Sequence, residues 1–228
     1  MSTNYSDRPV ALPETTQILS FAAGPFETNC YVLIDGSDAT SGENFPAVVI
    51  DPGLGAYEHI QGLATEHNFK VEKVVLTHGH IDHIRDAGAF GVSVFVHELD
   101  RFMLEMDQAA SPLAVPFDVA NMPAIEDIHP LEDSISIGGT EFEIHHMPGH
   151  SPGHVMFRVD GLIIGGDVLF RGGVGRTDLP GCSPEDMMLS LKKLTTDFAD
   201  EDIVLPGHGP HTTIGEEKRT NSFLAAVK

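Results

Sequence analysis

The stretch from Lys73 to Ile84, with the sequence KVVLTHGHIDHI, constrains this chain more than any other. The apolar run at 74–76 predicts a short buried strand, which ends in a turn at 77–79. Four side chains of metal-binding type follow within six positions: His78, His80, Asp82 and His83. A lone pair of histidines is usually a surface or core feature. Three imidazoles and a carboxylate at one strand end favour a divalent metal site instead.

The spacing of these residues suggests two ions. His78 and His80 flank a glycine, which lets the backbone bend so that both rings converge. Asp82 and His83 are adjacent, so their side chains leave the backbone in different directions. We therefore expect Asp82 and His83 to serve a second ion.

Three later segments repeat one arrangement, in which a ligand-type residue and a glycine follow a predicted strand. They are Pro148-Gly149-His150, Gly165-Gly166-Asp167 and Pro206-Gly207-His208-Gly209. Glycine allows a close approach of the backbone to a site. The repetition is more informative than any single instance. The segment at 149–153 also matches the Gly-x-Ser-x-Gly elbow of serine hydrolases, but Pro152 would have to supply a backbone N–H that proline lacks.

Together, the His-x-His-x-Asp-His motif and the three later segments resemble the metallo-β-lactamase superfamily, from about Gly24 to Thr213. The resemblance implies seven metal ligands in two groups joined by one carboxylate: His78, His80 and His150; Asp82, His83 and His208; and the bridging Asp167. It implies two divalent ions, with zinc expected first and iron or manganese as alternatives. Two such ions lower the pKa of a shared water to about 7, so a bridging hydroxide can attack a substrate carbonyl.

The predicted elements suit this fold. Strands are expected at 17–22, 29–34, 47–50, 74–76, 92–96, 134–137, 141–147, 155–159, 162–164 and 203–205. Helices are expected at 57–68, 84–89, 97–106, 184–198 and 215–227, and residues 109–129 as a loop or broken helix that borders a pocket or forms a surface excursion. The order, in two similar halves, predicts an α+β fold, an αββα sandwich of two mixed sheets. We expect a polar tail at 1–14 and a single domain at 15–228.

Composition limits the classes of function and partner that the chain can have. Thirteen Lys and Arg against 34 Asp and Glu give a net charge of −21, which disfavours nucleic acid as a partner. No apolar run is long enough to cross a bilayer, so we expect no membrane partner. The start of the chain lacks the features of a secretory signal, and two cysteines are too few for a disulfide framework. These features predict a cytoplasmic protein; nothing indicates its oligomeric state.

Within the superfamily, the segments at 166–178 and 206–210 resemble the glyoxalase II-like branch, the hydroxyacylglutathione hydrolases. An acidic residue at 167, where the antibiotic-degrading zinc enzymes carry cysteine, argues against a β-lactamase. The resemblance implies hydrolysis of a small acyl thioester such as S-lactoylglutathione. This chain ends soon after the last ligand, without the C-terminal helical domain of full-length glyoxalase II, so another thiol carrier is possible.

Two residue roles and two other reactions stay open. Asp82 is our candidate for accepting the proton of the nucleophile as well as binding metal. Arg176 stands where the family can place a basic residue against the carboxylate of the thiol carrier, but it can equally form a salt bridge with Asp178. The alternatives to a thioester hydrolase are a persulfide dioxygenase, with one iron on His78, His150 and Asp167, and a lactonase. Loss of ligand-type residues at some of the seven positions would have favoured a non-catalytic protein, but all seven positions carry one.

Overall fold

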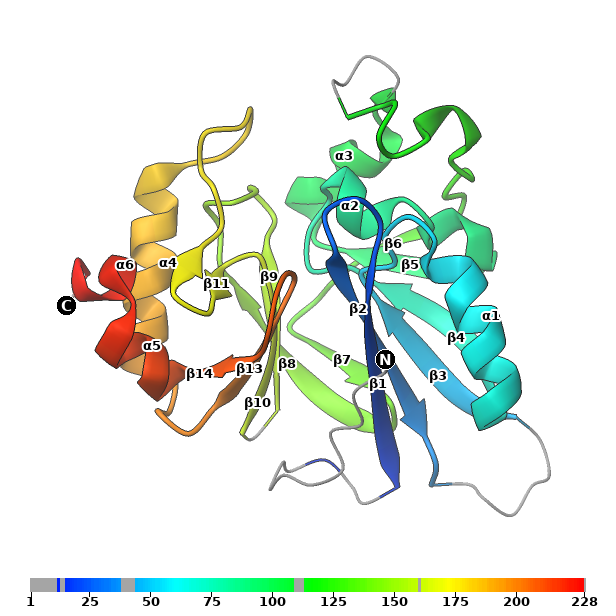
Figure 1. Ribbon diagram of the computed structural model, residues 1–228, viewed down its shortest axis with the longest axis horizontal. Coiled ribbons are helices and arrows are strands. Elements are labelled where there is room, and N and C mark those ends of the chain that lie inside the picture. The colour runs from blue at the N-terminus through cyan, green and yellow to red at the C-terminus, as the bar shows by residue number, and fades with distance from the viewer. Residues whose placement is uncertain (1–11, 13–14, 38–43, 109–112, 160, 228) are drawn as a thin grey trace.

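Two six-stranded sheets lie face to face, with helices over the outer face of each (Figure 1). The computed structural model describes residue 12 and residues 15–37, 44–108, 113–159 and 161–227. This arrangement confirms the expected α+β fold and its αββα order. The expected tail at 1–14 lies almost entirely outside the described residues. Among the described helices, none has the length and apolar character needed to span a membrane.

The first sheet has the order β1-β2-β3-β4-β5-β6. Its first two pairs are antiparallel, and the pairs from β3 to β6 are parallel. The strands are β1 (Thr16–Ala23), β2 (Thr28–Asp35), β3 (Phe45–Ile50), β4 (Phe69–Val75), β5 (Ser93–Val96) and β6 (Ile128–Pro130). Strand β6 was not expected, because residues 109–129 show no clear periodicity.

The second sheet has the order β14-β13-β10-β9-β8-β7. The β10–β13 pair is parallel, and the other pairs are antiparallel. The strands are β7 (Ser134–Ile137), β8 (Thr140–His146), β9 (Val155–Val159), β10 (Leu162–Gly166), β13 (Ile203–Pro206) and β14 (Thr212–Thr213). A separate two-stranded sheet pairs β11 (Leu169–Phe170) with β12 (Gly173–Val174).

The core has three layers because successive strand residues point to opposite faces of a sheet. In β2, Val32 packs toward the helices outside the first sheet, and its neighbour Leu33 packs between the two sheets. Phe157 of the second sheet also lies fully buried between the sheets. A third cluster, which includes Leu191 of α4, fills the space between the second sheet and its helices.

Helix α1 covers the first sheet, while α4, α5 and α6 cover the second (Figure 1). The helices are α1 (Ala56–His67), α2 (Ile81–Ile84), α3 (Arg101–Glu105), α4 (Pro184–Asp197), α5 (Ile214–Thr220) and α6 (Ser222–Ala225). Short 3₁₀ turns are η1 (Ala87–Phe90), η2 (Glu98–Asp100) and η4 (Val119–Asn121). Ser183 caps α4, since its side chain accepts a hydrogen bond from the backbone N–H of Asp186.

Three helix predictions were wrong in detail. In place of the helix expected at 84–89, α2 ends at Ile84 and the 3₁₀ turn η1 follows, so Asp82 and His83 lie in α2. The helix expected at 97–106 is divided into η2 and α3. Of its large apolar side chains, Met103 is buried, whereas Leu99, Phe102 and Met106 are exposed. The helix expected at 215–227 breaks at Asn221, whose side chain caps α6 by accepting from the backbone N–H of Phe223.

The strand ends that carry the ligand-type residues meet at one edge of the sandwich. Strands β3 and β4 are parallel neighbours in one sheet, and β10 and β13 are parallel neighbours in the other. Hydrogen bonds join the two sheets at this edge: the backbone N–H of Asn29 donates to the carbonyl of Gly207 over 2.7 Å, and that of Val155 donates to the carbonyl of Thr77 over 2.9 Å. The edge is therefore a rigid platform for a site.

Candidate metal centre

The structure brings the seven ligand-type residues together at this edge, although they come from four different segments. Their ligand atoms form three groups, within each of which all atoms lie within 4.8 Å of one another. The groups are His78, His80 and His150; His78, His83 and Asp167; and Asp82, His83 and His208. The first and third groups share no residue, so the geometry suits two ions.

The Asp167 carboxylate lies between these two groups. Its Oδ2 atom is 3.4 Å from Nε2 of His150 and 3.3 Å from Nε2 of His208. Its Oδ1 atom is 3.4 Å from Nε2 of His83. One carboxylate that faces imidazoles of both groups has the placement of a bridging ligand.

Three buried atoms at the centre of the cluster have no hydrogen-bond partner among the described residues. They are Nε2 of His78, Nε2 of His83 and Oδ1 of Asp167. Buried polar atoms are nearly always satisfied, so three unsatisfied atoms that converge require an explanation. A divalent cation provides one, and imidazole with carboxylate is a donor set that suits zinc or iron. The residues therefore fit the metals that the sequence predicts.

Hydrogen bonds behind the imidazoles turn their Nε2 lone pairs toward the centre. Nδ1 of His150 donates to the carbonyl of Arg176 over 2.8 Å, and Nδ1 of His208 donates to the carbonyl of Phe26 over 2.9 Å. Nδ1 of His83 donates to the Asp51 carboxylate over 3.0 Å. An imidazole that donates from Nδ1 keeps its Nε2 lone pair for a metal.

The protonation states of His80 and Asp82 are those that metal binding requires. Burial, together with the neighbouring His150, lowers the pKa of His80 to about 4, so the ring is neutral at pH 7. Burial would raise the pKa of Asp82, but His83 and His208 hold it well below its usual range. Neutral imidazoles and ionised carboxylates are the forms that bind metals.

Two imidazoles behave differently in the metal-free protein. Burial lowers the pKa of His208, but its hydrogen bonds to Asp167 and Asp82 outweigh burial and raise the pKa to about 10. Burial also opposes protonation of His83, whose pKa is nonetheless raised by Asp82, Asp167 and Asp51. Protons on these two rings balance the carboxylates, and a bound cation would replace them.

Asp51 is a site residue that sequence reasoning missed. It follows β3 and is 1% exposed, with a backbone φ of 53°. Its carboxylate accepts hydrogen bonds from the backbone N–H and hydroxyl of Thr77, at 2.8 and 2.7 Å, as well as from His83. Since the Thr77 hydroxyl donates to Asp51, it accepts from Nδ1 of His78. The signal was the Asp-Pro-Gly sequence directly after a buried strand, which placed Asp51 at the same edge as His78.

His154 packs behind the cluster. Its ring centroid is 6.1 Å from that of His150, the ligand-type residue nearest to it in the sequence. His154 stacks on His78 instead, at 4.8 Å, and its Nε2 accepts from the backbone N–H of Asp167 over 2.9 Å. It therefore supports both Asp167 and His78.

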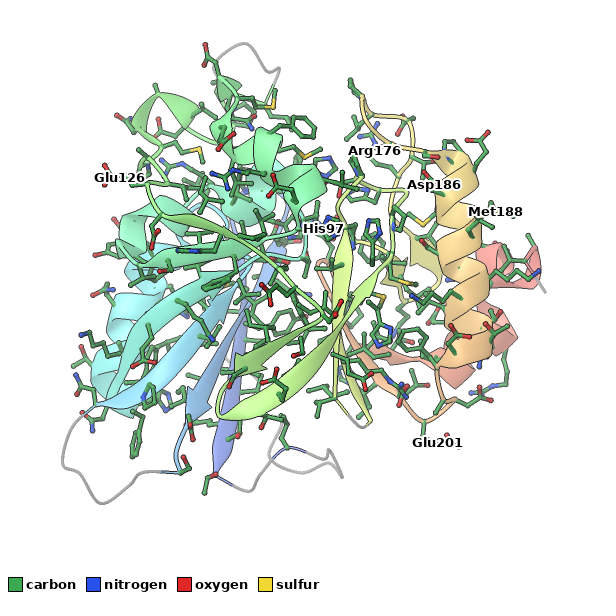
Figure 2. All side chains as sticks on the ribbon, turned by 180° about the vertical axis from the view of Figure 1, so that it is seen from behind. His97, Glu126, Arg176, Asp186, Met188 and Glu201 are labelled. Atoms are coloured by element: carbon green, nitrogen blue, oxygen red, sulfur yellow. The ribbon has the colours of Figure 1, made fainter. Side chains whose placement is uncertain are left out.

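Arg176 lies on the loop between β12 and α4 (Figure 2). Its guanidinium makes two hydrogen bonds to Asp178, from Nε to Oδ1 over 2.7 Å and from Nη2 to Oδ2 over 2.8 Å. This salt bridge is one of the two roles that the sequence allowed for Arg176. Arg176 contacts the metal-binding cluster through its backbone carbonyl, which accepts from His150.

Comparison with known proteins adds a family match. A family model described as the metallo-beta-lactamase superfamily matches residues 23–208. An uncharacterized protein of Mycobacterium tuberculosis is 36% identical, over 92% of this chain and 98% of the relative. Hydroxyacylglutathione hydrolase GloC of Haemophilus influenzae is 35% identical, over 87% of this chain and 93% of the relative.

Solved structures agree on the fold. The crystal structure of the BLEG-1 B3 metallo-beta-lactamase has a TM-score of 0.76 and 32% identity, covering 91% of this chain and 99% of that one. A structure of TTHA1623 in a di-iron-bound form has a TM-score of 0.75 and 35% identity, covering 90% and 98%. ETHE1 from Myxococcus xanthus has a TM-score of 0.64 and 26% identity, covering 91% and 84%.

Proposed function

Because the chain belongs to the metallo-β-lactamase superfamily, we propose that it is a dinuclear metal-dependent hydrolase that cleaves a small acyl thioester. The observation that carries the proposal is the pair of separate ligand groups with Asp167 between them. The relative named hydroxyacylglutathione hydrolase GloC supports the thioester as substrate, since it matches over nearly its whole length. S-lactoylglutathione or a related thiol ester is the proposed substrate.

The proposed ligands are the seven residues predicted from the sequence. His78, His80 and His150 would hold one ion; Asp82, His83 and His208 the other; and Asp167 both. Zinc is our first choice, with iron or manganese as alternatives, and the di-iron structure of TTHA1623 favours testing iron directly. When bound, two divalent ions supply an activated water and a Lewis acid for the thioester carbonyl.

Asp82 has the position for a second role beside metal binding. Its Oδ2 atom accepts from the hydroxyl of Thr28 over 3.0 Å and lies 3.2 Å from Nε2 of His208. Held in this way, the carboxylate can accept the proton of the nucleophile without moving. In Asp82→Asn, lower turnover with both metals retained would support this role. Loss of a metal would leave Asp82 only as a ligand.

Arg176 is the proposed contact for the carboxylate of the thiol carrier. Its guanidinium is exposed and held in a fixed orientation by Asp178. The same salt bridge offsets its charge, so substrate binding competes with Asp178. Comparing Arg176→Ala with Asp178→Asn separates the two roles, because the second variant frees the cation.

Steady-state assays with S-lactoylglutathione test the proposal, with nitrocefin and a simple lactone as comparison substrates. We expect thioester hydrolysis with a kcat/KM at least 100-fold above that for nitrocefin and the lactone. An enzyme that leaves the thioester intact and consumes oxygen with glutathione persulfide would be the mononuclear iron dioxygenase instead. Faster hydrolysis of nitrocefin or of the lactone would refute the choice of substrate but retain the hydrolase.

A further inference from the structure

A buried carboxylate behind the metal-binding cluster joins two of its loops. Asp100, at the end of η2, is completely buried. Its Oδ2 atom accepts from the backbone N–H of Gly79 over 3.0 Å and from the hydroxyl of Ser151 over 2.5 Å. Its Oδ1 atom accepts from the backbone N–H of Gly153 over 2.5 Å. The loop that contains Gly79 and the loop of Ser151 and Gly153 are 70 or more positions apart in the sequence.

The donors are direct neighbours of the proposed ligands. Gly79 lies between His78 and His80, and Ser151 follows His150. All three residues of the first ligand group are therefore attached to backbone that Asp100 holds. The same two loops also meet at the ligand-type residues themselves, where Nδ1 of His80 and Nε2 of His150 lie within hydrogen-bond distance, 2.9 Å apart.

The surroundings of Asp100 are built for a carboxylate. A Cβ atom at Gly153 would lie 2.7 Å from the backbone nitrogen of Asp100 and 2.8 Å from its Oδ1, so only glycine allows the hydrogen bond there. The three donors that reach the carboxylate in the described part of the chain are neutral. A buried charge without a cationic partner is costly, and hydrogen bonds offset only part of that cost. Cations in the adjacent ligand group would offset more of it.

We infer that Asp100 is a positioning residue for the metal centre: it clamps the loop of His78 and His80 to the loop of His150 and places a negative charge behind the first ligand group. The inference rests on the metal site in the proposed function but not on its substrate. Supporting partners of this kind typically change metal affinity by 10–100-fold when they are removed.

The test is zinc transfer from the fully loaded protein to a chromophoric chelator, without substrate. In Asp100→Asn, one acceptor oxygen becomes a donor that opposes an N–H or O–H, and the charge is lost. We expect the affinity for one of the two zinc ions to fall 10–100-fold. We also expect an altered d–d spectrum after zinc is replaced by Co²⁺. The matched control is Asp202→Asn. Asp202 is 2% exposed, bound to Arg158, and at the opposite end of β13 from the site.

A purely structural Asp100 would lower the melting temperatures of the loaded and stripped proteins alike. Zinc affinities within twofold of wild type and an unchanged Co²⁺ spectrum would overturn the inference. Should Asp100→Asn fail to fold, Ser151→Ala removes one donor only, and we expect zinc binding weakened about threefold to tenfold; unchanged binding in that variant would again overturn it. A wild-type protein that binds zinc but does not cleave thioesters would refute the proposed function alone, whereas one that binds no metal would refute both.

Discussion

Replacing Gly207 with alanine should inactivate the enzyme without unfolding it. Gly207 precedes His208, and a Cβ atom built on it would lie 2.0 Å from Oδ1 of Asp167 and 2.8 Å from Cε1 of His83. Real Cβ contacts are essentially never shorter than 3.0 Å, so the carboxylate oxygen must retreat by about 1 Å. Both atoms lie at the ends of side chains, so the added methyl group displaces residues of the site and leaves the backbone of the fold in place.

The expected magnitude follows from this displacement. A shift of 1 Å in a catalytic group can reduce the rate about 100-fold, and we expect that loss in kcat for S-lactoylglutathione. The control is Gly62→Ala, because Gly62 lies in α1 with no atom within 4 Å of its added Cβ. That variant should keep full activity and gain about 0.5–1 kcal/mol in stability. A Gly207→Ala enzyme with more than half of the wild-type kcat and both metals bound would refute the steric argument.

Three further predictions concern pH, the core and the substrate. The pKa of His208 is raised from 6.5 to about 10 in the metal-free protein, so its stabilising contribution is complete below about pH 6.5 and is lost as the pH rises toward 10. The melting temperature of the stripped protein should fall over this interval while zinc affinity rises, and His208→Gln should reduce both trends; a flat melting temperature would contradict the assignment. Phe157→Ala should lower the free energy of unfolding by about 3–5 kcal/mol in urea titrations, and a loss below 1 kcal/mol would show that Phe157 does not support the core between the sheets. Arg176→Ala should raise KM for S-lactoylglutathione about tenfold with little change in kcat, since a contact remote from the reacting bond affects binding. Asp178→Asn should lower KM, and equal effects of the two variants would identify the pair as structural.

The fold and the seven clustered residues could be predicted because their signals are local. Each ligand-type residue follows an apolar strand and stands next to or near glycine, as His150 and His208 do. Strand ends in a sandwich of this order meet at one edge, so residues far apart in the sequence become neighbours. The resemblance to the superfamily assigned them to two groups, and the structure brings together the same two sets of residues.

The roles of the supporting residues could not be predicted, because they depend on contacts between distant segments. Asp51 reaches His83 across 32 positions, and Asp100 reaches Gly153 across 53. Neither stands in a motif of metal-binding type. The helix boundaries failed for a related reason: Asn221 donates to the carbonyl of Gly173, 48 positions away, and this tertiary contact accompanies the break between α5 and α6.

The most direct measurement is the metal content per chain, by mass spectrometry, of wild-type protein and of His208→Ala, each purified without added metal. The account predicts about two metal ions per wild-type chain and about one in His208→Ala, because only the second ligand group loses a residue. One iron per chain in both proteins would contradict the dinuclear centre, since His208 would then hold no metal.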